Sequence, residues 1–557
     1  MEAATFVARY LKAAGVKRAF GLPGGEVLAL VEGLRAAGVD VILTHHEGQA
    51  AMMAEATGWL TDLPGVCFST LGPGASNLVS GVANAFLDRA PLLAFSGDHS
   101  DAFKPRNTHQ QLDLVELFAP ITRFAGELSA ENALDLLTRL FDVATGTTPV
   151  GQPGPVYLTV ANEELRLTVA DPAMAERHVE RAGNRWRASS SIRFGDERDP
   201  FERAAMTVDA SQRPVIVAGI QVVQYSVERQ LRELAERINA PLLVTPQAKG
   251  SLPEDHALFA GTFGAFGQPA IDSLLQSSDL AIMAGVDGVD FITPWPTKPP
   301  ALSITGVPER RRTFQPIFEV AQSPLALDRL TARCRPKPAW LDVEGHRRRL
   351  AAGIHLGWSA GTFQADTGSM SPQTVLKALR ETLPADGILT CDVGSHKLQA
   401  CQQWQTLAPK TFLTSNGLSS MGYAIPAAVA AKLELPDRHV AAILGDGGLL
   451  MYAGELETVA RLGLPLTLVV LVDQSLSLIK LKQERDALPI HAVDFGPVDY
   501  AGLAQDLGLN GRRCPTYEDL SSALRAASRA DRATLIEVPI DMGWYRPPTG
   551  QAALDVG

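Results

Sequence analysis

Residues 440–482 read VAAILGDGGLLMYAGELETVARLGLPLTLVVLVDQSLSLIKLK and contain two apolar runs separated by a helical pattern. The first run, Val440 to Leu444, ends at the turn Gly445-Asp446-Gly447-Gly448, and the second, Leu466 to Val472, ends at Asp473. Between the runs, apolar residues recur at the spacing of a helix. This order predicts strand, turn, helix and strand, which is the βαβ unit of a parallel sheet.

A carboxylate follows each predicted strand, Asp446 after the first and Asp473 after the second. In a right-handed βαβ unit both strands end at the same edge of the sheet, so we expect the two carboxylates to lie together. The glycines let the backbone approach a phosphate, and the next helix points free N–H groups at it. Gly-Asp-Gly alone is also an ordinary turn sequence. The second acidic strand end favours a phosphate site with Mg²⁺, which prefers oxygen ligands.

With both strand ends in place, the stretch resembles the metal- and diphosphate-binding motif of thiamine diphosphate enzymes. In that motif Gly-Asp-Gly is followed by a helix, a strand and Asn-Asn, whereas Val472 and Asp473 stand here in place of the asparagines. The resemblance implies that thiamine diphosphate is held through Mg²⁺, with Asp446, Asp473 and the main-chain carbonyl of Ser475 as metal ligands. It also implies cofactor contacts from Gly445, Gly447, Gly448, Leu476 and Leu478.

Composition limits the class of protein. The 557 residues are enough for three domains, and 46% hydrophobic with 20% charged residues describes a globular chain. A formal net charge of −11 argues against a nucleic-acid partner. The five cysteines form no CxxC pair and indicate reduced thiols. Because no apolar run is long enough for a membrane span and no signal-peptide pattern is present, we expect a cytoplasmic protein without a membrane partner.

The order of elements predicts an α/β fold of three doubly wound parallel-sheet domains. By the resemblance these are a pyrimidine-binding domain at residues 1–170, a central Rossmann-like domain at 190–335 and a diphosphate- and Mg-binding domain at 360–545. The central domain lacks the GxGxxG fingerprint of a dinucleotide site after its first strand, Pro214 to Ala218. The charged segment 171–199 has no strand pattern and is interpreted as a linker.

The resemblance covers nearly the whole chain and is strongest to the catalytic subunit of acetolactate synthase. It is carried by Gly21–Gly25, His46–Gly48, Leu71–Leu78 and Thr414–Ala427. It implies a transferase or lyase that decarboxylates a 2-oxo acid and joins the product to a second carbonyl (carboligation). It also implies a homodimer or homotetramer whose active site lies at the subunit interface.

The resemblance gives Glu47 the central catalytic role, because a glutamate at this position bonds the aminopyrimidine ring of the cofactor. Without the resemblance, Glu47 is a first-turn carboxylate favoured by the helix dipole. Glu55, two turns further along, matches no motif and is expected to be a solvated or capping charge. Met421 matches the apolar wedge beneath the cofactor, and the Ser419 carbonyl matches an acceptor for its amino group. The alternative for Met421 is a core methionine.

Further candidates lie on loops. Ser395 and His396 match a turn that contacts the diphosphate, with an ordinary surface Ser-His pair as the alternative. Gly24 and Gly25 are expected to keep the substrate wall open, since glycine projects no Cβ. Gln110 matches a glutamine that orients a substrate carbonyl or carboxylate. His109 replaces the usual phenylalanine and either shuttles protons or packs on the surface.

Two departures bear on the reaction. Lys482 replaces the tryptophan that selects the second keto acid in acetolactate synthases, and Asp287-Gly288-Val289-Asp290 replaces an arginine-bearing stretch that helps hold flavin. Both departures argue against bound FAD and against the standard acetolactate reaction. A lysine at position 482 either pairs with an anionic acceptor or stays solvated. Simple decarboxylation of a 2-oxo acid, a 2-hydroxyketone lyase, a flavin oxidase and a non-catalytic relative remain as alternatives.

Overall fold

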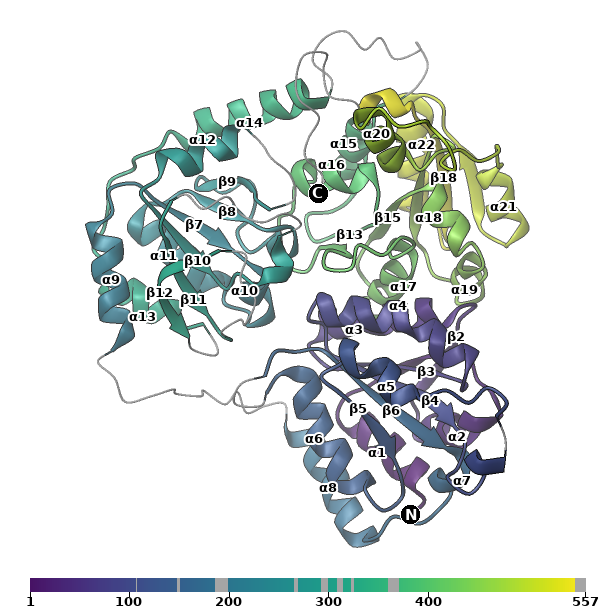
Figure 1. Ribbon diagram of the computed structural model, residues 1–557. Coiled ribbons are helices and arrows are strands. Elements are labelled where there is room, and N and C mark those ends of the chain that lie inside the picture. The colour runs from purple at the N-terminus through teal and green to yellow at the C-terminus, as the bar shows by residue number, and fades with distance from the viewer. Residues whose placement is uncertain are drawn as a thin grey trace. The chain divides into compact units, whose positions relative to one another are not determined.

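The structure is a computed structural model that describes residues 1–106, 108–147, 151–185, 199–264, 269–291, 299–307, 314–321, 325–358 and 370–545. It contains three six-stranded sheets, in which every pair of neighbouring strands is parallel, with helices around each sheet (Figure 1). This confirms the predicted α/β class with three doubly wound sheets. The domain limits stay predictions, and those at 190 and 360 lie outside the described residues.

The first sheet has the strand order β2-β1-β3-β4-β6-β5. Its strands β3, β4 and β6 are almost entirely buried, because a parallel sheet is covered on both faces and its central strands become continuous apolar runs. β5 is half-exposed at the edge, and the sequence pattern did not predict it. The strand bounds are β1 (Arg18–Gly21), β2 (Asp40–Leu43), β3 (Gly65–Ser69), β4 (Leu92–Asp98), β5 (Phe124–Leu128) and β6 (Pro155–Ala161).

The helices of this region are α1 (Ala3–Ala13), α2 (Leu28–Ala36), α3 (Glu47–Thr61), α4 (Pro73–Leu87), α5 (Leu114–Phe118), α6 (Ala133–Thr145), α7 (Asn162–Leu165) and α8 (Pro172–Arg185). α8 corrects the interpretation of 171–199 as a linker. Ala175, Val179 and Ala182 repeat at helical spacing and pack on the core of the first sheet. The many charges between them hide this narrow apolar stripe in the sequence.

Two later segments, Leu418–Pro436 and Tyr452–Leu464, belong to the same compact unit as the first sheet, and the rest of the chain forms a second unit. These segments carry α17 (Ala424–Glu434) and α19 (Glu455–Arg461). α17 packs along α3 (Figure 1). Arg18 of β1 donates to Glu434 Oε1 at 2.8 Å and fixes the end of α17.

The central sheet has the order β12-β11-β10-β7-β8-β9. Its strands are β7 (Pro214–Ala218), β8 (Leu242–Val244), β9 (Phe259–Thr262), β10 (Leu280–Ala284), β11 (Ala301–Thr305) and β12 (Pro316–Ala321). Its helices are α9 (Pro200–Ala210), α10 (Ile220–Gln224), α11 (Glu228–Ile238), α12 (Pro269–Ser277), α13 (Leu327–Arg333) and α14 (Val343–Trp358).

The third sheet has the order β14-β13-β15-β16-β18-β17. Its strands are β13 (Ile388–Cys391), β14 (Phe412–Thr414), β15 (Val440–Gly445), β16 (Thr467–Val472), β17 (Asn510–Arg513) and β18 (Thr534–Pro539). Its helices are α15 (Pro372–Thr382), α16 (Ser395–Gln403), α18 (Asp446–Met451), α20 (Ser477–Arg485), α21 (Tyr500–Asp506) and α22 (Tyr517–Ala527). β14 lies on one side of β13 and β15 on the other, so the strand order reverses between β13 and β15. Doubly wound sheets bind ligands at the carboxyl ends of the strands where this reversal occurs.

None of the helices within the described ranges is both long and apolar enough to cross a membrane.

Candidate functional site

The two acidic strand ends of the third sheet meet, as the βαβ pattern predicts. β15 and β16 are neighbours, with Gly445 opposite Leu471, so Asp446 and Asp473 emerge at the same edge. Asp446 Oδ2 accepts hydrogen bonds from the main-chain N–H groups of Asp473 at 3.2 Å and Gln474 at 2.7 Å. The Asp446 carboxylate therefore fixes the turn that follows β16.

Burial disfavours a negative charge on both carboxylates. It raises the pKa of Asp446, which is 2% exposed. Burial, together with the nearby charge of Asp446, raises the pKa of Asp473 to about 7, although the Ser477 hydroxyl donates to Asp473 Oδ2 and opposes the shift. A divalent cation between the two carboxylates would reverse this effect and favour the ionised forms.

The donor set at this edge suits a hard cation that shares its coordination with phosphate. No group of three or more His, Cys, Asp or Glu side chains is arranged for a metal ion in the part of the chain that is described. Two carboxylates with main-chain and phosphate oxygens match the usual surroundings of Mg²⁺. Ser475, whose carbonyl is the third predicted ligand, donates its N–H to Asp473 Oδ1 at 3.2 Å. The residues present therefore fit Mg²⁺ with a diphosphate.

Ser395 and His396 lie beside this edge, at the start of α16. A Cβ added at Gly445 would be 3.5 Å from His396 Cε1, which places the imidazole next to the end of β15. Ser395 is 4% and His396 3% exposed, so the surface-pair alternative is wrong. Ser395 Oγ and His396 Nε2 have no hydrogen-bond partner among the described residues. Two unpaired buried polar atoms beside the glycine-rich turn fit a diphosphate as their partner.

His396 has a defined protonation state. Burial lowers its pKa to about 4, so the ring is neutral near pH 7, and it hydrogen-bonds the main chain of Asp392. With Nε2 unpaired, the bonded nitrogen is Nδ1.

The remaining predicted residues near the two acidic strand ends lie on the loop after β16 and on α20. Leu476 N donates to Val493 O at 2.7 Å, and Leu478 packs against the apolar core of the third sheet. Lys480 Nζ forms an ion pair with Asp494 Oδ1 at 2.9 Å. Lys482 lies on α20 and is partly buried. The structure does not test the predicted cofactor contacts of the two leucines.

Glu47 is the first residue of α3, in the unit that contains the first sheet. His46 is the N-cap, and its Nδ1 accepts from Gly48 N at 3.0 Å, which stops β2 from continuing and starts the helix. Glu47 is 7% exposed, and its Oε2 accepts from Asn77 Nδ2 of α4 at 3.0 Å. A Cβ added at Gly74 would be 3.1 Å from Glu47 Oε1, so this glycine leaves room for the carboxylate.

The predicted glycines of the substrate wall have different roles. A Cβ at Gly24 would overlap the side chain of Thr70, so Gly24 permits the loop after β1 to pack on the loop after β3. Gly25 faces open space, with no described atom within 4 Å of an added Cβ. The role of the two glycines in a substrate wall stays a prediction. Through Thr70 and Gly74, the loop after β1 adjoins Glu47.

Gln110 and His109 lie on an exposed loop of the same unit. Gln110 has φ 57° and packs over Gly72. A Cβ added at Gly72 would be 2.7 Å from the Cβ of Gln110. The main-chain carbonyl of His109 accepts from His99 Nε2 at 3.0 Å. The structure therefore brings Gln110 to the start of α4 and leaves the His109 ring exposed.

Met421 and Ser419 lie on the turn that precedes α17. Ser419 is exposed with φ 55°, Met421 is partly buried and Gly422 has φ 83°. A side chain at Gly422 would overlap the ring of Tyr452, which in turn contacts His46 edge-on at 5.1 Å between ring centroids. The Met421 turn is thus tied through Tyr452 to the N-cap of α3. The wedge role itself stays a prediction.

Glu55 contradicts the expectation of a solvated or capping charge. It is 2% exposed, and its carboxyl accepts from the hydroxyl of Tyr423, which is also 2% exposed and opens α17. Burial raises the pKa of Glu55 well above its usual value, and the charge of Asp88 raises it further. Glu55 lies on the face of α3 that packs against α17, and burial there favours its neutral form over its charged form.

Glu455 is a positioning residue that the sequence patterns did not reveal. Its Oε1 accepts from the main-chain N–H groups of His45 at 2.8 Å and His46 at 3.1 Å, and its Oε2 accepts from Thr458 Oγ1 at 2.8 Å. It therefore holds the turn that carries Glu47. The neighbouring His45 contacts Glu457 Oε2 through Nε2 at 2.7 Å. The sequence offered Glu455 only as a polar residue of a predicted helix.

Asp290, in the stretch after β10 that was expected to bear on flavin binding, is fully buried. Asp290 accepts from Asp287 N at 2.9 Å, Thr245 Oγ1 at 2.6 Å and Ile220 N at 3.2 Å. Burial raises its pKa to about 7. The N–H group that opens α10 is thereby bonded to an internal carboxylate. The expectation that flavin is absent stays a prediction.

The fold and these residues define an α/β protein with a candidate site for Mg²⁺ and a diphosphate. Three family models match its sequence: the thiamine pyrophosphate enzyme N-terminal TPP binding domain at residues 1–117, the central domain at 201–310 and the C-terminal TPP binding domain at 392–538. The chain therefore belongs to the thiamine pyrophosphate enzyme family.

Curated relatives match over most of their length. The acetolactate synthase of Bacillus subtilis (strain 168) is 28% identical over 544 residues, covering 95% of this chain and 91% of that protein. The acetolactate synthase isozyme 2 large subunit of Escherichia coli (strain K12) is 28% identical over 563 residues, covering 97% and 96%. A putative thiamine pyrophosphate-containing protein of B. subtilis, YdaP, is 29% identical over 537 residues, covering 94% and 89%.

Proposed function

We propose that this protein is a thiamine diphosphate- and Mg²⁺-dependent enzyme that decarboxylates a 2-oxo acid and joins the product to a second carbonyl compound. The observation that carries the proposal is the meeting of Asp446 and Asp473 at one sheet edge, beside the unpaired buried atoms of Ser395 and His396. When bound, thiamine diphosphate supplies the carbanion stabilisation that this reaction class requires.

On the diphosphate side, the residues bind and orient. Asp446, Asp473 and the main-chain carbonyl of Ser475 would hold Mg²⁺, while Ser395 and His396 would contact the diphosphate. The N-terminus of α18 begins at Asp446, so its free N–H groups favour a negatively charged group there.

On the pyrimidine side, Glu47 would hydrogen-bond the aminopyrimidine ring and exchange a proton with it through its carboxylate. Asn77 orients that carboxylate by its bond to Oε2. Met421 would support the cofactor, and the Ser419 carbonyl would accept from its amino group. Gly24, Gly25, His109 and Gln110 would form the substrate side.

Carboligation is favoured over simple decarboxylation because proteins named acetolactate synthase match along nearly the full chain. Lys482 and the Asp287–Asp290 stretch favour a different acceptor and a flavin-free enzyme. By the family resemblance, the working form is a cytoplasmic homodimer or homotetramer with its active site between subunits.

The experiment is a panel of 2-oxo acids, each supplied alone and with a second carbonyl compound. Release of CO₂ and the mass of the products are measured, with Glu47→Gln as the background control. Release of CO₂ with a product longer than the donor fragment supports the proposal. Aldehyde alone would identify a simple decarboxylase. No CO₂ from any acid, with thiamine diphosphate bound, would identify a non-catalytic member of the family.

A further inference from the structure

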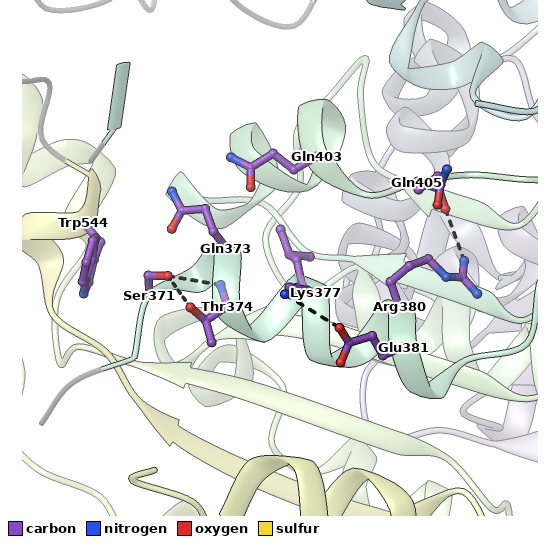
Figure 2. A pocket seen from close by; sticks show the side chains of 10 residues that line it. Ser371, Gln373, Thr374, Lys377, Arg380, Glu381, Gln403, Gln405 and Trp544 are labelled. Atoms are coloured by element: carbon purple, nitrogen blue, oxygen red, sulfur yellow. Dashed lines mark hydrogen bonds and ion pairs between the residues drawn. The ribbon is translucent and has the colours of Figure 1, made fainter. Parts of the chain in front are cut away.

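A pocket of about 450 Å³ lies against α15 and the end of α16, next to the short 3-10 helix Met542–Tyr545 (Figure 2). Its volume falls within the range of small-molecule sites, roughly 300–1,000 Å³. None of its described lining residues belongs to the candidate cofactor site. It is therefore a separate cavity of the unit that contains the third sheet.

Unpaired amide atoms of two glutamines gather at this pocket. Gln373 Nε2 and Oε1 and Gln403 Nε2 are buried and have no hydrogen-bond partner among the described residues. Gln373 and Gln403 line the same pocket, and Figure 2 shows their amide ends directed to the side on which Trp544 lies. Because an unpaired buried polar atom is unfavourable, this grouping favours an occupant that pairs with both amides.

The charges of the wall are already engaged within the chain. Lys377 Nζ lies 3.9 Å from Glu381 Oε1. Arg380 donates to Gln405 O at 3.2 Å and to Leu383 O at 2.7 Å, and it stacks over Trp404. Both cations of the wall have partners within the chain, and the unpaired polar atoms of the pocket belong to neutral amides, so the pocket favours a neutral ligand that pairs with those amides.

We propose that this pocket binds the adenine base of a neutral nucleoside. A glutamine amide pairs with adenine through two bonds, because its N–H donates to N7 and its carbonyl accepts from the exocyclic N6 amino group. Gln373 has both of these atoms unpaired, and Gln403 Nε2 adds a donor for a second ring nitrogen. Trp544 provides an aromatic surface, and a base stacks favourably on such a surface.

The test is calorimetric titration of the full-length protein, saturated with thiamine diphosphate and Mg²⁺, with adenosine. We expect one site with a Kd below about 1 mM. Inosine, which has an acceptor where adenosine has the N6 amino group, should bind at least tenfold more weakly. Adenosine 5′-monophosphate should bind no more tightly than adenosine.

Variants locate the site. Gln373→Leu should weaken adenosine binding at least tenfold, and Trp544→Leu should weaken it severalfold. Gln402→Leu, a matched change on α16 outside the lining, should leave it unchanged. Unchanged thiamine diphosphate affinity and far-ultraviolet circular dichroism show that each variant is folded.

Absence of adenosine binding at millimolar concentration would overturn the proposal. Equal affinity for inosine, or an unchanged Kd in Gln373→Leu, would also overturn it. Because the cofactor site is separate and saturated, these outcomes leave the proposed decarboxylation untouched.

Discussion

Glu47 is a buried carboxylate that keeps one side-chain partner, Asn77, and leaves Oε1 next to the space that Gly74 provides. Such an arrangement holds the carboxylate in one orientation without neutralising it. A group that must exchange a proton with a ring nitrogen needs both properties.

Glu47→Gln should therefore retain thiamine diphosphate affinity within a few-fold, because glutamine has nearly the same size and can still contact Asn77. Turnover of the best 2-oxo acid should fall by about 10²–10⁴-fold, since the proton-exchanging group is lost. The measurements are CO₂ release and calorimetric titration of the cofactor. The exposed Glu131→Gln is the matched control, and near-normal turnover of Glu47→Gln would remove this residue from the mechanism.

Glu55 predicts a pH dependence of stability. Its pKa in the folded protein lies well above the ordinary value of 4.5. The contribution of Glu55 to the free energy of unfolding is therefore fully present below pH 4.5. It is lost as the pH rises through the pKa of Glu55 in the folded protein. Between pH 4.5 and that pKa, the free energy of unfolding should fall by up to about 1.4 kcal/mol per pH unit because of this one group.

Glu55→Gln should remove this dependence because the amide stays neutral. Melting temperatures of the variant and the natural protein, measured from pH 5 to pH 8, should diverge in favour of the variant as the pH rises. Glu131→Gln should follow the natural protein throughout. Parallel curves for Glu55→Gln and the natural protein would show that Glu55 ionises without cost.

The acidic strand ends were predictable from the sequence, whereas Glu55 and Glu455 were not. Asp446 and Asp473 follow two neighbouring strands, so a local rule of βαβ geometry brings them together. Glu55 is buried by Tyr423 and α17, which lie far away in the sequence. Glu455 acts on His45 and His46, which are equally distant. The residue pattern of one segment cannot predict a partner that lies in a distant segment.

At the scale of the element, the predicted helix after Gly448 is divided into α18 and α19, and Glu455 at the start of α19 holds the turn before α3. The edge strands β5, β9 and β17 also escaped prediction. Because these strands are short and polar or lie beside glycines, they lack the apolar runs that reveal the central strands.

Glu455→Ala should destabilise the protein by about 1–3 kcal/mol, because it leaves the N–H groups of His45 and His46 without their acceptor. It should also lower turnover by shifting Glu47. Glu455→Gln retains an acceptor oxygen and should recover most of both losses. Chemical denaturation and CO₂ release measure the two effects, and equal damage from Gln and Ala would contradict the acceptor role.

The Met421 turn allows a matched pair of glycine substitutions. Gly422 and Gly463 both have positive φ, at 83° and 61°, but only at Gly422 would a Cβ overlap another residue, Tyr452. Gly463→Ala should therefore lower the free energy of unfolding only by the backbone strain, about 1 kcal/mol. Gly422→Ala should lower it by clearly more, because its Cβ also overlaps Tyr452. Thermal melting compares them. Equal shifts would show that the turn before α17 is loosely packed.

At the scale of the whole molecule, two of the three parallel sheets carry the candidate residues: the first sheet carries those proposed for the pyrimidine side, and the third sheet carries those proposed for the diphosphate side. The loops after β1, β2 and β3 place Gly25, Glu47 and Thr70, and the loops after β13, β15 and β16 place the residues proposed for the diphosphate side. In the third sheet these loops flank the point at which strand addition reverses. The alternation of strands and helices made this architecture predictable. The particular acceptor is not predictable, because it depends on loop side chains such as Lys482.

The central claim is that Asp446 and Asp473 hold Mg²⁺ and thereby thiamine diphosphate. The most direct measurement is calorimetric titration of the protein with thiamine diphosphate, in Mg²⁺ and in a chelator. For the natural protein, thiamine diphosphate should bind at least tenfold more weakly in the chelator than in Mg²⁺. With Mg²⁺ present, Asp446→Ala and Asp473→Ala should each weaken binding at least tenfold. The exposed Asp486→Ala should bind as the natural protein does. Unchanged affinity in both strand-end variants would contradict the account.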